Sequence, residues 1–134
     1  MNLSTYIGQH QTIRGEINII NNLINKGNIV EDAMEIALHI NLLAGKLNIH
    51  LSLEDKYLYP DLQKRNEEKL KEIADGYKRE MSGLFDAFNE YKIKFNTKTK
   101  IIEQKELFIA HTKRIVNQII RRMEKEEKEL YTQI

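Results

Sequence analysis

The sequence predicts an all-α protein folded as an up-down-up-down antiparallel four-helix bundle. Three observations lead to this prediction. Apolar residues recur every three or four positions over long stretches, which is the pattern of an amphipathic helix. The chain of 134 residues contains one proline and no tryptophan. Short polar breaks separate the apolar stretches, and helices joined by short connections usually pack antiparallel.

The first two helices meet at a polar turn. Isoleucines at positions 13, 17, 20 and 24 mark the buried side of the first helix. Gly27 in the turn 25–28 suits the left-handed conformation that follows a helix C-terminus. The second helix is expected over about residues 30–65, with Pro60 kinking or ending its last turns.

The third helix is expected over about residues 67–95 and the fourth from about 102 to the end, with a polar break at 96–100 between them. Each helix has one apolar side and one charged side, so each needs the other three to bury its apolar side. The length is that of one domain, and we expect residues 1–134 to form a single bundle.

The chain also contains an internal repeat. The pattern His50-x-x-x-Glu54-x-x-x-Leu-Tyr in the second helix corresponds to Arg122-x-x-x-Glu126-x-x-x-Leu-Tyr in the fourth. Pairs of glycines with the same spacing align the first helix with the third. Helix periodicity alone does not fix where glycine falls, so the bundle is predicted to be two pseudo-repeated helical hairpins.

Composition excludes several classes of function. Lys and Arg total 21 against 20 Asp and Glu, so no electrostatic attraction to nucleic acid or to an anionic membrane is expected. The absence of cysteine excludes disulfides and thiolate metal sites. No apolar run has membrane-spanning length, and the N-terminus lacks a signal pattern, so the sequence predicts a cytoplasmic protein.

Four side chains are expected to converge in the bundle core. His10 lies on the apolar side of the first helix, and His50 and Glu54 lie one turn apart on that of the second. Glu126 enters the same level from the fourth helix. A lone buried histidine is usually a hydrogen-bonded packing residue, but a buried carboxylate must be paired, protonated or metal-bound. Two imidazoles and two carboxylates together suit iron, manganese or zinc.

With these residues in place, the chain resembles the hemerythrin-like (HHE cation-binding) family. The resemblance rests on His10, on the phrase His50-Leu-Ser-Leu-Glu54-Asp-Lys-Tyr-Leu-Tyr-Pro60 and on its second copy at 122–131. It implies a four-helix bundle in which histidines and two bridging carboxylates hold a pair of non-haem irons. It also implies roles in binding dioxygen, in storing or sensing iron, or in responding to oxygen and nitric oxide.

Carried over by residue, the resemblance places His10, His50 and Glu54 on ligand positions and Glu126 on the second carboxylate. The third-helix histidine position holds Lys78, or Tyr77 if the register differs by one, and the fourth-helix position holds Arg122. Lysine and arginine are poor ligands. Our hypothesis is that both cations replace the charge of one metal and leave a site for the other. The alternative is that both extend to solvent and the site no longer binds metal.

Other residues near the expected site have alternative roles. His39 and His111 should face each other across the core about 16 Å from the site. There we expect satisfied core histidines, although such a pair could bind a second metal or a haem. His111 stays a candidate ligand of the main site if the fourth helix is shifted. Tyr57 is expected to line the pocket. In the charge run 124–129, only Glu126 has the register to turn inward.

The function predicted from these residues is that of a non-enzymatic metal-binding protein with iron in the core. It would bind or sense oxygen, nitric oxide or iron. One alternative is a metal-free bundle that serves as a structural or interaction module. Another is an iron-dependent oxidoreductase, for which the sequence offers no nucleophile–base arrangement.

Overall fold

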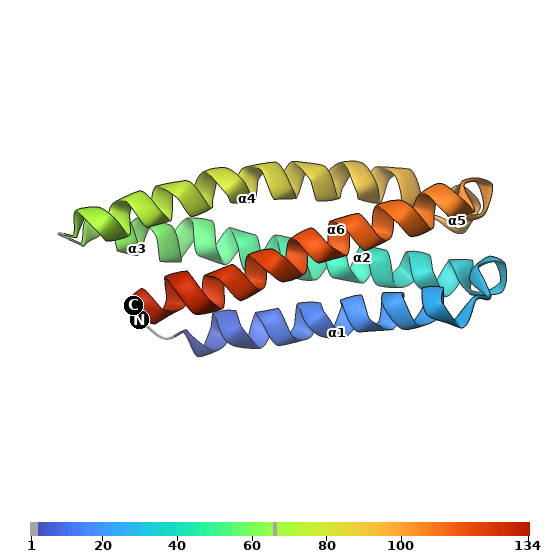
Figure 1. The fold of residues 1–134 in the computed structure, drawn as a ribbon, viewed down its shortest axis with the longest axis horizontal. Coiled ribbons are helices and arrows are strands. Elements are labelled where there is room, and N and C mark those ends of the chain that lie inside the picture. The colour runs from blue at the N-terminus through green and yellow to red at the C-terminus, as the bar shows by residue number, and fades with distance from the viewer. Residues whose placement is uncertain (1–2, 66) are drawn as a thin grey trace.

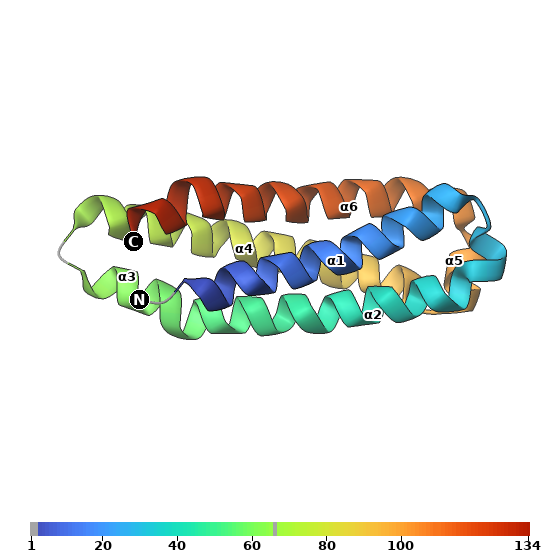
Figure 2. The same cartoon turned by 90° about the horizontal axis from the view of Figure 1, so that it is seen from below.

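The computed structural model describes residues 3–65 and 67–134, and within them it contains helices and turns but no strand. The predicted all-α class is confirmed. The long helices lie side by side along the length of the molecule (Figure 1 and Figure 2). They are α1 (Ser4–Lys26), α2 (Ile29–Leu53), α4 (Glu68–Phe95) and α6 (Lys105–Lys125). Two short helices, α3 (Tyr59–Lys64) and α5 (Lys98–Glu103), accompany them, so the simple four-helix plan holds only in part.

The turn between α1 and α2 has the predicted geometry. Gly27 has a φ of 83°, in the left-handed region, and its N–H donates to the carbonyl of Ile24 at 3.1 Å. Glu31 and Asp32 occupy the first turn of α2, where their negative charge stabilises the positive end of the helix dipole. Glycine is the residue that adopts this φ without strain, which explains the sharp reversal here.

The predicted second helix does not continue unbroken to residue 65. It ends at Leu53, and a π-helical turn, η1 (Glu54–Leu58), leads into α3, whose first turn holds Pro60. Proline has no N–H to donate, so the α-helical hydrogen-bond ladder cannot pass through it. The helix does not end at Pro60, which lies in the first turn of α3, where a missing N–H is tolerated. The α-helical geometry instead changes six residues earlier, at Glu54.

The end of α6 repeats this arrangement. A second π-helical turn, η2 (Glu126–Leu130), follows α6, and a 3₁₀ turn, η3 (Tyr131–Gln133), ends the described chain. The two π turns begin at Glu54 and Glu126, the equivalent positions of the internal repeat. π turns widen the backbone and are frequent at functional sites.

The polar break before α6 is shorter than expected. Only residues 96 and 97 lie outside a helix, because α5 already begins at Lys98. The Thr97 side chain caps α5 by accepting a hydrogen bond from the Lys100 N–H at 3.3 Å. Gln104 separates α5 from α6.

Successive long helices run in opposite directions (Figure 1). α1 begins at the end of the molecule where α3 lies and η3 terminates, and the α1–α2 turn lies at the other end with α5 (Figure 1). α1 and α2 are in extensive contact, and α4 packs on both α2 and α6. None of the helices in the described ranges combines the length and the apolar character that a membrane crossing requires.

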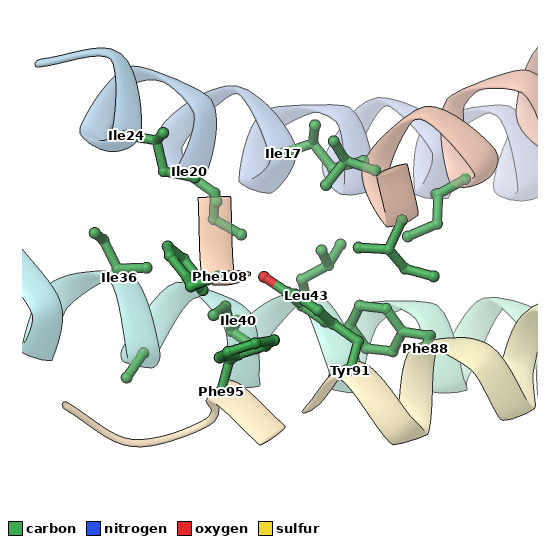
Figure 3. Close-up of a cluster of buried hydrophobic side chains, with 14 of the residues drawn as sticks. Ile17, Ile20, Ile24, Ile36, Ile40, Leu43, Phe88, Tyr91, Phe95 and Phe108 are labelled. Atoms are coloured by element: carbon green, nitrogen blue, oxygen red, sulfur yellow. The ribbon is translucent and has the colours of Figure 1, made fainter. Parts of the chain in front are cut away.

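Buried apolar side chains form two clusters along the length of the molecule. In the larger, Ile17 and Ile20 of α1 face Ile40 of α2 and the aromatic rings of α4 (Figure 3). The smaller cluster gathers at the end that holds α3. It consists of Tyr6, Leu58, Tyr59, Leu62, Ala74, Tyr77, Leu130 and Tyr131. The candidate metal ligands fall between the two clusters along each helix that carries them, so apolar packing holds them from both sides.

Candidate metal centre

Two histidines meet in the core between α1 and α2. His10 is 0% exposed and His50 is 1% exposed. Their Nε2 atoms lie 3.0 Å apart and point at each other. Each helix brings its histidine inward because the residue shares the side of the isoleucine and leucine stripe, one turn before Ile13 and one turn after Leu47.

Two carboxylates join this pair of histidines. Oε1 of Glu54 lies 3.1 Å from Nε2 of His50. Oε1 of Glu126 lies 3.4 Å from Nε2 of His10 and 3.9 Å from Nε2 of His50. Both glutamates are fully buried, and each is the first residue of a π turn. All four residues predicted to converge therefore do so.

The donor atoms of this group fit a metal ion better than they fit one another. Oε1 of Glu54 and both carboxylate oxygens of Glu126 are buried without a hydrogen-bond partner. Leaving such groups unpaired in a core is costly. Ligand atoms held about 2.1 Å from one ion lie about 3.0–3.4 Å apart, close to the distances between these nitrogens and oxygens. His10, His50 and Glu126 each offer a ligand atom, and the three atoms lie within 4.8 Å of one another.

The Nδ1 atoms of the two histidines point away from the site, so their Nε2 atoms are the ones placed to act as ligands. Nδ1 of His50 lies 2.8 Å from Oε1 of Gln9, so it carries the proton and donates. Nδ1 of His10 lies 3.6 Å from Oε2 of Glu127, which Arg14 holds through two hydrogen bonds. In His50, the proton on Nδ1 leaves the lone pair of Nε2 directed into the site, the tautomer that a metal requires. Nδ1 of His10 makes no hydrogen bond within the described residues.

Tyr131 closes the site on the side of the smaller apolar cluster. Its hydroxyl donates to Oε2 of Glu54 at 3.2 Å, and its ring stacks on His10 with centroids 5.6 Å apart. Burial raises the pKa of Tyr131 far above the usual range, and the nearby carboxylates of Glu126 and Glu54 raise it further. The phenol therefore stays protonated and acts as a donor to Glu54.

The carboxylates and histidines shift one another's protonation. Burial lowers the pKa of His50, but Glu126 and Glu54 more than offset this and raise it to about 9. Burial raises the pKa of Glu54, and the charge of Glu126 raises it further. Burial also acts to raise the pKa of Glu126, but its neighbours Glu54, His10 and His50 and the charge of Arg122 lower it overall. Without a metal, the site thus retains protons that a bound cation would displace.

Arg122 lies beside Glu126. It is 7% exposed, and its Nε lies 3.9 Å from Oε1 of Glu126, one turn along the helix. Its terminal nitrogens donate to Glu80 at 2.9 Å, to the Tyr77 carbonyl at 2.7 Å and to the Tyr59 hydroxyl at 3.2 Å. The guanidinium also stacks on the Tyr77 ring at 4.2 Å. A permanent positive charge is therefore fixed beside the carboxylates, as the hypothesis for Arg122 requires.

Lys78 does not share this role, which corrects the sequence-based hypothesis. Its side chain is 53% exposed and pairs at 3.9 Å with Asp55 on the surface. Tyr77 takes the inward position instead, at 5% exposure, and its hydroxyl donates to the Lys125 carbonyl and to Glu129. The inward residue of α4 thus differs by one from the first choice made from the sequence, which followed the alignment of the third helix with the first. Tyr77 belongs to the buried side of α4, together with Ala74 and Met81.

His111 does not reach the other four residues, so the shifted-helix alternative is wrong. It lies four turns before Glu126, about 22 Å along the helix axis. Its ring packs edge-on against Tyr91 and Phe95, with centroids 5.4 and 5.7 Å away. Burial lowers the pKa of His111, and the positive charges of Arg114 and Lys94 lower it further. His111 is therefore a packing residue.

His39 does not pair with His111. Its Nδ1 lies 2.7 Å from Oε2 of Glu16, a buried carboxylate of α1 that also binds Lys46. The expectation of satisfied histidines is confirmed for His39, but its partner is on α1 rather than across the core.

Sequence reasoning missed the residues that orient the ligands. Tyr57 was expected to line the site and is instead 55% exposed, while Tyr131 does line it. The repeat contained a signal for Tyr131, since it occupies the position equivalent to the buried Tyr59. No sequence pattern marked Gln9 as a site residue, because the residue next to an inward-facing one points about 100° away from it on an ideal helix. Glu127 was assigned to the solvated face and in fact reaches His10.

Comparison with known proteins agrees with this geometry. The family described as the hemerythrin HHE cation-binding domain matches residues 1–134, the whole chain. No curated protein and no solved structure matches the chain significantly. The match spans both copies of the repeat and every residue of the buried histidine and glutamate group, and it shows that the chain belongs to the hemerythrin HHE cation-binding domain family.

Proposed function

We propose that this protein binds one iron ion in its core through His10, His50, Glu54 and Glu126. The observation that carries the proposal is the approach of two imidazole Nε2 atoms to 3.0 Å beside carboxylate oxygens that have no hydrogen-bond partner. Mixed nitrogen and oxygen ligands of this kind suit iron and also accept zinc or manganese. The family match supports a cation in this site.

A single ion, rather than a pair, is supported by Arg122. Nε of Arg122 lies 3.9 Å from Oε1 of Glu126, the same carboxylate oxygen that faces His10 and His50. A fixed positive charge at this distance opposes a second cation bound to that carboxylate. Arginine stays protonated at ordinary pH and does not ligate metals. Tyr77, in the inward position of α4, is already engaged through its hydroxyl with Lys125 and Glu129.

We propose a binding or sensing role rather than an enzymatic one. A ferrous ion held there would supply a centre that can coordinate a diatomic gas, dioxygen or nitric oxide. The chain's own contribution is to flank the site with two apolar clusters, to hold Nδ1 of His50 against Gln9 so that its Nε2 faces the site, and to place the Tyr131 hydroxyl, which donates to Glu54, at the edge of the site. These features favour binding over group transfer, for which no activated nucleophile is present in the site.

Elemental analysis of protein produced in iron-rich medium tests the proposal directly. We expect about one iron per chain. His50→Ala should abolish uptake, whereas His111→Ala, a matched histidine outside the site, should leave it unchanged. About two irons per chain would contradict the single-ion site. Absence of any metal in a folded wild-type chain would favour the alternative, a metal-free bundle in which Arg122 alone neutralises Glu126.

A further inference from the structure

A cavity of about 280 Å³ extends from the surface between α2 and α4 to the candidate metal centre. Its walls are mainly apolar, and its floor is formed by His50, Arg122 and Glu126. On α2 it runs from Asn41 to Leu51, about 15 Å of helix. Its volume lies just below the usual range for small-molecule sites, about 300–1,000 Å³, so a bound molecule would be small and narrow.

Gly45 opens one wall of this cavity. It lies on α2, and a Cβ added there would meet no atom within 4 Å. The apolar walls come from every long helix and include Ile13, Leu47, Leu84, Phe88, Ile119 and Met123. A linear apolar chain would therefore be covered by side chains along its length, and burial of each CH₂ would favour binding.

Charge is distributed unevenly along the cavity. Arg122, at the floor, has its terminal nitrogens engaged with Glu80, Tyr59 and Tyr77. Lys92 lines the other end, and no described carboxylate pairs with it. Asn89, half-buried beside Lys92, has an amide with no protein partner among the described residues. Glu126 is the lone carboxylate of the described lining, and it lies beside Arg122, which also pairs with Glu80. Lys92 is thus the lining cation without a described carboxylate partner, and its charge favours an anion at its end of the cavity.

We propose that this cavity binds an amphipathic monocarboxylate of medium chain length, with its apolar chain between α2 and α4 and its carboxylate at Lys92. The ligand would be a fatty acid or a carboxylic acid of similar shape. This site is independent of the metal, because none of the four proposed ligands is needed to hold the carboxylate.

Calorimetric titration of octanoate into the full chain tests this proposal, with octanol as the uncharged comparison. Octanoate should bind more tightly than octanol. Lys92→Gln should weaken octanoate binding about fivefold, the contribution of a partly exposed ion pair, and leave octanol binding unchanged. Lys94→Gln, a neighbouring exposed lysine outside the cavity, is the matched control and should change neither.

Filling the cavity is the second part of the test. Gly45→Leu should abolish binding of both compounds, whereas Gly15→Leu, at an exposed glycine of α1 that is equally free of neighbours, should not. Helix content measured by circular dichroism checks that both variants fold. Octanoate binding that survives Gly45→Leu, or that does not exceed octanol binding, overturns the proposal. Binding that disappears when a chelator removes metal would place the carboxylate on the ion and also overturn it.

Discussion

At the scale of single residues, Arg122 determines the character of the site. It is the repeat equivalent of His50, and Nε of Arg122 and Nε2 of His50 lie at the same distance, 3.9 Å, from Oε1 of Glu126. His50 directs Nε2 toward His10, while the Arg122 guanidinium donates to α4 and to Tyr59. One half of the repeat therefore offers a neutral nitrogen ligand and the other a fixed positive charge. A buried carboxylate next to such a charge needs no second cation.

Arg122→His should raise metal uptake from about one to about two ions per chain, since it removes the fixed charge and restores a nitrogen ligand. Elemental analysis of the purified variant is the measurement. Arg122→Met removes the charge without adding a ligand and should not gain a second ion. A folded Arg122→His variant with unchanged stoichiometry would refute the role assigned to the guanidinium.

At the scale of elements, the α1–α2 pair is held by its turn and by one buried ionic cluster. Glu16 of α1 is 6% exposed and contacts Lys46 at 2.5 Å and His39 at 2.7 Å, both on α2. Burial acts to raise the pKa of Glu16, but hydrogen bonds from Lys46 and His39 lower it overall. Since the folded pKa lies below the unfolded value of 4.5, the ionised group stabilises the fold above that pH, and this stabilisation is lost as the pH falls through the folded pKa.

Glu16→Gln should therefore lower the free energy of unfolding by about 1–2 kcal/mol at neutral pH. The deficit should become smaller near pH 3, because protonation of Glu16 removes the charge on which this stabilisation depends. Urea denaturation at the two pH values measures this difference. Glu35→Gln, at an exposed position of α2, is the control. Its free energy of unfolding should stay within about 0.5 kcal/mol of the wild-type value at both pH values. A deficit that persists unchanged at low pH would show that the loss of charge is not its cause.

The turn itself gives a second prediction for this element. Gly27→Ala should destabilise the protein by about 1 kcal/mol, because alanine is strained at a φ of 83°. Gly15→Ala should instead stabilise it by up to about 1 kcal/mol, since Gly15 lies inside α1 with room for a methyl group. Thermal or urea unfolding of both variants supplies the comparison. Equal effects of the same sign would contradict the conformational argument.

At the scale of the whole molecule, the four long helices meet around a polar level enclosed by two apolar clusters. The larger cluster and the smaller one pack tightly on either side, but the site between them holds unpaired carboxylate oxygens in the metal-free state. Folding without a cation therefore carries the cost of those buried groups, and binding of a cation to the folded state alone offsets it.

Metal removal should accordingly lower the Tm, and readdition of ferrous iron under anaerobic conditions should restore it. At a free iron concentration about 100 times the Kd, mass action stabilises the folded state by about 2.7 kcal/mol. Differential scanning calorimetry before and after chelation measures the shift. The Tm of the His50→Ala variant should not change when metal is removed or added back. A wild-type Tm that is indifferent to iron would mean that the buried carboxylates are neutralised by protons and Arg122 alone.

The sequence by itself determined the helical class, the reversal at Gly27 and the inward side of His10, His50, Glu54 and Glu126. Helix periodicity decides these features, because it relates each side chain to its neighbours on the same helix. The tertiary structure decided that His39 binds Glu16 and that His111 lies far from the centre. One residue changes the direction of a side chain by about 100° and its height by about 1.5 Å, so these outcomes depend on how the helices rotate and slide against one another. Packing between helices sets that rotation, and no pattern within a single helix records it.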